Sequence, residues 1–69
     1  MRRYEVYRQG KVICYVQQTE NRVAMVTQAN NDRRREDSFV CKTRESANRL
    51  YRAIQAMMEA LHVCVDYAS

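Results

Sequence analysis

The feature that most constrains the fold is an apolar stripe that recurs at steps of three and four residues. Its members are Ala47, Leu50, Tyr51, Ile54, Met57, Met58 and Leu61. At about 100° per residue in a helix, these side chains fall within roughly a third of the circumference. The stripe predicts an amphipathic helix over about 44–62. Thr43 is its predicted N-cap, because a threonine hydroxyl accepts a hydrogen bond from a free backbone N–H.

The residues before this helix alternate between apolar and polar with a period of two, which is typical of β-strands. The pattern predicts four strands, at 3–8, 11–17, 22–28 and 38–42. Gly10 falls between the first two strands, where a tight hairpin needs a left-handed residue. Residues 29–37 are predicted to form a long polar tip between the last two strands. After the helix, residues 63–67 alternate again, which favours either a frayed tail or a short last strand.

Together these elements predict an α+β fold: an antiparallel three- to four-stranded β-meander followed by one C-terminal amphipathic helix packed on one sheet face. We expect one domain over 1–69, with its strands within 3–42. A chain of this size buries only about 60% of its unfolded surface, so its stability depends on a staple or a partner.

Several function classes lack the residues that they need. No apolar run approaches the ~18 residues of a membrane span, and no signal-like apolar block follows Arg2 and Arg3, so we expect a cytoplasmic protein without a membrane partner. The single histidine and the lack of a glycine-rich phosphate loop argue against an enzyme. We predict no catalytic residues, no cofactor and no small-molecule substrate.

Three cysteines, Cys14, Cys41 and Cys64, stand far apart in the sequence. An odd number is not typical of a disulfide framework, so we interpret them as reduced thiols, at least two of them used as small core side chains. The alternative is a zinc site made by these thiols and His62. Because no C-x-x-C pair holds two ligands together, we predict no metal site.

One helix covers only one face of the sheet. Alternation assigns the helix-facing side to Tyr4, Val6, Val12, Cys14, Val16, Val23, Met25, Phe39 and Cys41. The uncovered face then carries Tyr7, Ile13, Tyr15, Ala24, Val26 and Val40. A free sheet face is usually polar, so an apolar and tyrosine-rich patch predicts an interface. The alternatives are that the faces are assigned wrongly, or that long arginine side chains lie over the patch.

The first functional prediction is therefore a small non-catalytic binding module. Its partner is a protein or a second copy of the chain, in a homodimer that uses the uncovered face. Inhibitors made by phages and mobile elements, anti-CRISPR proteins among them, are similar in size and in their lack of catalytic equipment. This similarity, of size alone, favours an inhibitor or regulator of a larger machine over an adaptor.

The second functional prediction is a nucleic-acid-binding domain. The net charge is +4, and ten of the twelve cations are arginine, which pairs bidentately with phosphate or guanine. Tyrosines on an open sheet stack on bases. The candidate contacts are Arg3, Arg8, Lys11, Arg22, Arg33, Arg34 and Arg35. In layout alone, the chain resembles the sheet-reading DNA-binding domains of plant transcription factors and integrase arm-binding modules. However, residues 32–37 hold three arginines and three acids, which makes this finger locally neutral.

Overall fold

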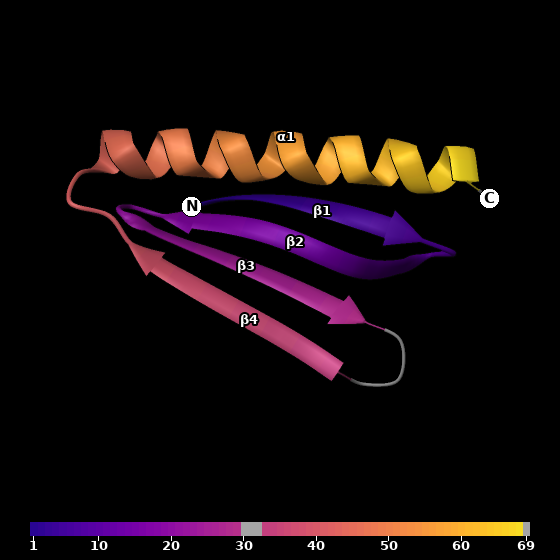
Figure 1. Cartoon of the computed structure of the whole chain (residues 1–69). Helices are drawn as coiled ribbons and strands as arrows, with labels where there is room; N and C mark the ends of the chain where they lie inside the picture. Colours follow the sequence, from indigo (N-terminus) through magenta and orange to yellow (C-terminus); the bar gives the residue numbers. More distant parts are fainter. Residues whose placement is uncertain (30–32, 69) are drawn as a thin grey trace.

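The computed structural model describes residues 1–29 and 33–68, with side chains described for 1–27 and 34–61. Four strands and one helix follow one another along the chain (Figure 1): β1 (Arg2–Arg8), β2 (Lys11–Thr19), β3 (Arg22–Ala29), β4 (Arg33–Val40) and α1 (Arg44–Ala68). The strands form one antiparallel sheet in the order β1-β2-β3-β4. The predicted α+β fold, a meander followed by a C-terminal helix, is confirmed.

Two-residue turns join the first three strands. Between β1 and β2, Gln9 and Gly10 have φ values of 52° and 78°, the pair of left-handed residues that a type I′ hairpin requires. Between β2 and β3, Glu20 has a φ of 55°. Because the turns are so short, antiparallel pairing begins with the residues that flank each of them.

A β-bulge changes the predicted alternation on β2. Val6 pairs with Cys14, whereas Tyr7 pairs with Val12, so Ile13 is an extra residue opposite this step. Ile13 packs against the core. Val12 is paired with Tyr7, so its side chain lies with that of Tyr7 on the sheet face opposite the helix. The prediction that Val12 faces the helix and Ile13 the uncovered side is therefore wrong, because one extra residue exchanges the faces.

β4 begins earlier than predicted. It covers Arg33–Val40, where the sequence analysis placed a strand over 38–42 and a polar tip over 29–37. Most of that tip is strand, and residues 30–32 lie outside the described part of the chain. This strand is rich in charged residues and lies at the edge of the sheet. Natural proteins often place charges on edge strands, where they discourage pairing with another chain.

α1 begins where predicted and ends later. The backbone N–H of Ser46 donates to Thr43 Oγ1 at 3.1 Å, which confirms Thr43 as the N-cap. The helix runs to Ala68, beyond the predicted end near 62, and the alternative of a short strand over 63–67 is wrong. Helix propagation adds one hydrogen bond for each residue fixed, so the helix continues past the end of its apolar stripe.

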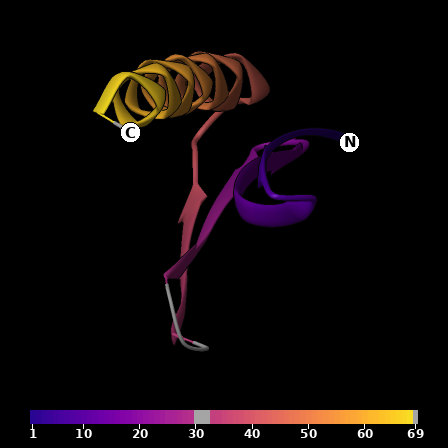
Figure 2. The same cartoon turned by 90° about the vertical axis from the view of Figure 1, so that its right-hand side faces the viewer.

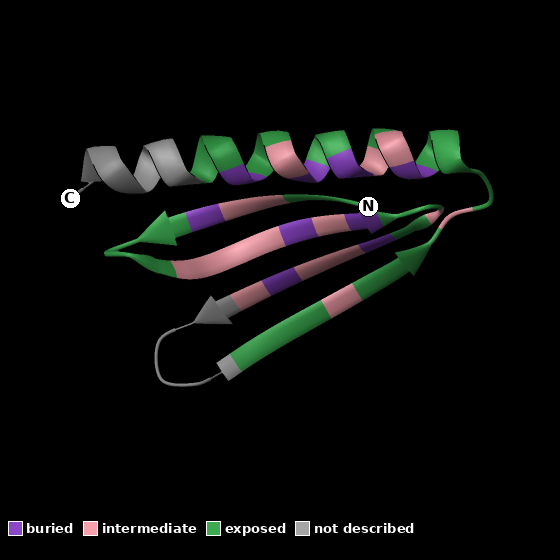
Figure 3. Cartoon of the chain, turned by 180° about the vertical axis from the view of Figure 1, so that it is seen from behind, coloured by how far each residue is buried: buried purple, intermediate pink, exposed green. Residues whose placement is uncertain are grey.

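The core lies between α1 and the first three strands. Its buried members are Val6, Val16, Val23, Ala47, Tyr51, Ile54 and Met58. In Figure 3 the buried segments of the helix lie on its sheet-facing side. Burial of these apolar side chains is the main force that holds the helix on the sheet.

The helix leaves β4 uncovered. Figure 2 shows the β3–β4 hairpin extending away from α1. Phe39 on β4, which the sequence analysis placed under the helix, is 42% exposed. An α-helix is about 10 Å wide and strands lie about 4.8 Å apart, so one helix spans only two to three of the four strands.

Candidate protein-binding groove

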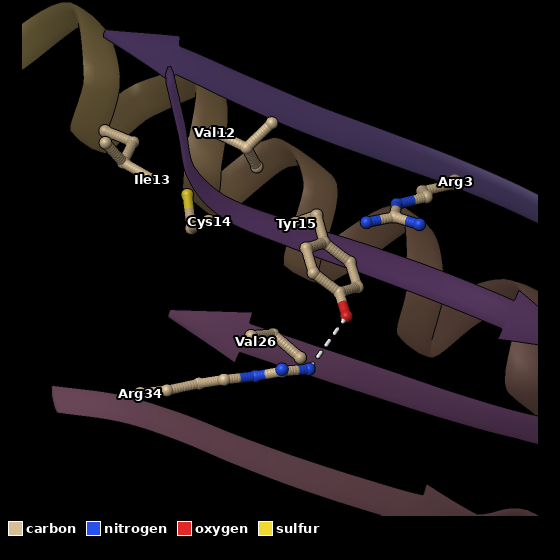
Figure 4. A pocket seen from close by; sticks show the side chains of 7 residues that line it. All are labelled: Arg3, Val12, Ile13, Cys14, Tyr15, Val26 and Arg34. Carbon is tan, nitrogen blue, oxygen red and sulfur yellow. Dashed lines mark hydrogen bonds between the residues drawn. The ribbon is translucent and has the colours of Figure 1, made fainter. Parts of the chain in front are cut away.

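Arginine side chains cover the centre of the sheet face opposite the helix. Val26 on this face is only 4% exposed, although no helix covers it. The Arg3 guanidinium lies 3.8 Å from the centroid of the Tyr15 ring, and Arg34 donates to the Tyr15 hydroxyl at 3.4 Å (Figure 4). These side chains border a cleft of about 290 Å³. Arginine stems thus cover apolar surface here while the guanidinium groups stay near water.

Acidic neighbours pair with the same two arginines. Arg3 lies 3.5 Å from Glu5, and Arg34 lies 3.7 Å from Glu36. Such exposed ion pairs contribute little to stability, yet they place a carboxylate beside each charge that a phosphate would use. The face of the Tyr15 ring that stacks on Arg3 is also unavailable to a base.

The other members of the predicted patch are dispersed. Tyr7 is 54% exposed near the β1–β2 turn, and Val40 is 68% exposed at the far end of β4. Ala24 is half-buried between them. Tyr15 and Val26 are direct partners in the β2–β3 register, so the structure brings these two together at the centre of the face.

The predicted nucleic-acid contacts divide between the two ends of the sheet. Arg8 and Lys11 pair beside the β1–β2 turn, at the end where β4 begins, whereas Arg22 lies at the opposite end (Figure 1). Arg35 lies on the helix-facing side and pairs with the acid two residues further on, at 3.3 Å. The side chain of Arg33 lies outside the described residues. The candidate cations therefore do not form one surface.

A polar cluster that the sequence analysis missed closes the β1 flank of α1. Gln18 is 4% exposed, and its Nε2 donates to Asn48 Oδ1 at 2.7 Å and to the Glu20 carbonyl at 3.0 Å. Arg2 Nε donates to Gln18 Oε1 at 2.8 Å, and its guanidinium lies 4.2 Å from the Tyr51 ring centroid. We call Arg2, Gln18, Asn48 and Tyr51 the polar clasp. Within the described part of the chain, no buried side-chain N or O atom lacks a hydrogen-bond partner.

The opposite flank of α1, toward β3 and β4, is apolar and open. Leu50, Met57 and Leu61 lie along it, and the last two are 47% and 58% exposed. A groove of about 260 Å³ separates this flank from the sheet. We call it the helix-side groove; its apolar lining is Val6, Ile13, Cys14, Met25, Met57, Met58 and Leu61, and its polar members are Arg8 and Thr27.

Phe39 adds to the apolar surface on this side of the sheet. It pairs with the core residue Val23 across β3 and β4, which places its side chain on the helix-facing side. Further along β4 on the same side, the Arg35–Asp37 ion pair forms a polar border. Phe39 is thus a second exposed apolar residue on the helix-facing side, separate from the lining of the groove.

The sequence analysis placed Met57 and Leu61 in the apolar stripe of the helix, and the structure places them at the open edge of the core. The buried helix residues Ala47, Tyr51 and Met58, together with Ile54, span only about 60° of the helix at 100° per residue. The full stripe is about twice as wide. The stripe residues outside this buried arc are Leu50, Met57 and Leu61, and their presence was the sequence signal for the groove.

Burial raises the pKa of two titratable side chains near the core. It raises the pKa of the Cys14 thiol above its ordinary 9.0, and it is the chief cause that raises the pKa of Tyr4 above 10.0. Cys14 and Cys41 are free thiols, as predicted. The side chains of His62 and Cys64 lie outside the described residues. Among the residues that are described, no group of three or more His, Cys, Asp or Glu side chains is placed to hold a metal ion.

Comparison with protein-family models, with curated proteins and with solved structures finds no match to the chain. Over the described residues, no helix combines the length and the apolarity that crossing a membrane requires. We therefore base the functional proposal on the chemistry of the two sheet faces. In the helix-side groove the exposed Met57 and Leu61 lie together beside one apolar lining, whereas the exposed apolar residues of the opposite face, Tyr7 and Val40, lie at different ends of the sheet.

Proposed function

We propose that this chain is a non-catalytic protein-binding module that receives an amphipathic helix in the helix-side groove. The observation that carries the proposal is the pair Met57 and Leu61, about half exposed beside an apolar groove. Contiguous apolar surface of this kind is typical of interaction sites, and methionine adapts its shape to a bound partner. The protein-binding prediction thus moves from the opposite sheet face, which arginines cover, to the helix side.

The dimensions of the sheet favour a helix as the bound element. Packed helices lie 8–10 Å apart, so a second helix beside α1 would extend toward the uncovered strand β4, which carries the exposed Phe39 on its helix-facing side. Leu50, Met57 and Leu61 are separated by seven and four residues, the spacing at which one helix packs against another. A small module that occupies a helix of its partner can act as an inhibitor or regulator without catalytic residues.

Titration with labelled helical peptides tests this proposal. Synthetic amphipathic peptides with apolar residues at heptad spacing are added to the chain, and fluorescence anisotropy reports binding. We expect saturable binding to the natural chain and a loss of affinity of at least about tenfold in the double variant Met57→Glu/Leu61→Glu. Circular dichroism checks that this variant stays folded.

The matched control places one glutamate on the other flank of the same helix. Ala56 is exposed on the side toward Arg2 and Arg52, so Ala56→Glu should bind the peptides as the natural chain does. Equal affinity in the natural chain and the folded double variant would contradict the proposal. Binding of single-stranded DNA that weakens with salt and ignores both variants would instead favour the nucleic-acid prediction.

A further inference from the structure

We infer that the helix received in the groove is α1 of a second copy of this chain, in a two-fold homodimer. The inference rests on the proposed function, because it names the partner of the same groove. It differs from the homodimer predicted from the sequence, which used the opposite face of the sheet. Three observations support it.

The first observation is the exposed area. A folded monomer of 8.2 kDa is expected to expose about 4,500 Å², and this chain exposes 5546 Å². The excess of about 1,000 Å² is close to the ~800 Å² that each partner buries in a standard interface. The radius of gyration agrees, since it is 12.7 Å against about 11 Å for a compact chain of this length.

The second observation is the length of α1. Its 25 residues extend about 37 Å at 1.5 Å per residue, while the longest strand has nine residues and spans about 30 Å. Met58 is the last helix residue of the described core, and α1 continues for ten residues to Ala68. Short helical segments are marginal in water without tertiary packing, so this extension favours contact with a second molecule.

The third observation is that one flank carries both an apolar groove and exposed apolar side chains, the two parts that a self-complementary two-fold interface needs. Met57 and Leu61 line the groove and also project from it. With the two helices antiparallel, the projecting side chains of one copy enter the groove of the other. Each α1 then covers the partner's β4 and its exposed Phe39.

Light scattering during size-exclusion chromatography tests the inference. We expect the natural chain to elute with twice its 8.2 kDa mass and to dissociate on dilution. Met57→Glu/Leu61→Glu should elute as a single folded chain, and Ala56→Glu should remain a dimer. Should the double variant fail to fold, the single variant Leu61→Gln is the substitute, and it should raise the dimer dissociation constant by at least about tenfold.

The outcomes separate this inference from the proposed function. A natural chain that stays monomeric up to sub-millimolar concentration overturns the homodimer, as does a dimer that survives both groove variants. If that monomer still binds heptad-spaced peptides through Met57 and Leu61, the proposed function holds and only the choice of partner fails. If it binds no helix at all, both fail.

Discussion

The two flanks of α1 meet the sheet in opposite ways. On the β1 flank, the polar clasp joins Gln18 to the helix through hydrogen bonds as short as 2.7 Å. On the β4 flank, Met57 and Leu61 face an apolar groove. Hydrogen bonds demand fixed geometry, whereas apolar burial is non-directional. Directional contacts therefore fix the position of the helix within the chain, whereas the apolar flank stays open, as the proposed binding of a partner requires.

The largest effect is expected from truncating two adjacent methionines of α1, one in the buried core and one in the open groove. Met58 is 5% exposed and Met57 is 47% exposed. Met58→Ala should lower the free energy of unfolding by about 2–5 kcal/mol, because it removes buried methylene groups and leaves a cavity. Met57→Ala should lower it by less than about 1 kcal/mol. Urea denaturation of both variants measures the difference.

Both methionine variants are best compared in the Leu61→Glu background, so that association does not add to stability. In that background, the difference in unfolding free energy between the two variants reflects only contacts within one chain. If the two losses in unfolding free energy were equal, the boundary between core and groove would lie elsewhere on α1. If Met57→Ala caused a large loss of unfolding free energy only in the chain without Leu61→Glu, Met57 would stabilise the fold through contact with the second copy.

The polar clasp should be the next most sensitive feature. Gln18→Ala leaves Asn48 and Arg2 without their partner, which should lower the free energy of unfolding by about 1–3 kcal/mol. Gln17, the adjacent glutamine, is half-buried and belongs to the opposite phase of β2. Gln17→Ala should change stability by no more than about 0.5 kcal/mol. Similar denaturation midpoints for the two alanine variants would show that the clasp does not hold the helix.

Local signals in the sequence predicted the order of the elements, the position of the first turn and the start of the helix. Gly10 marked a hairpin because few other residues adopt positive φ, and Thr43 marked the helix start because its hydroxyl satisfies a free N–H. The bulge at Ile13 was not predictable in this way. It depends on how β1 and β2 pair, and alternation within one strand carries no information about its partner.

The candidate site was only partly predictable for a related reason. Periodicity gives the direction of the apolar stripe, but it does not give the width of the sheet beneath it, so it did not show that Met57 lies beyond the buried part of the stripe. Arg3 and Tyr15 are distant in sequence, and their stacking follows from the β1–β2 register. Gln18 did leave a signal, since it is a polar residue in phase with Cys14 and Val16 on the core side of β2.

The smallest expected effect concerns pH, and it involves Tyr4 and the groove residue Cys14. Burial raises the pKa of Cys14 above 9.0 and that of Tyr4 above 10.0, so the folded state favours the neutral form of each. Their contribution to stability is fully present below those ordinary values and is lost as the pH rises through the higher folded values. The free energy of unfolding should therefore fall as the pH rises from about 9 upward. Cys14→Ala should remove the earlier part of this fall and Tyr4→Phe the later part, as measured by urea denaturation across that range. A natural chain and variants with parallel pH profiles would show that neither group is desolvated on folding.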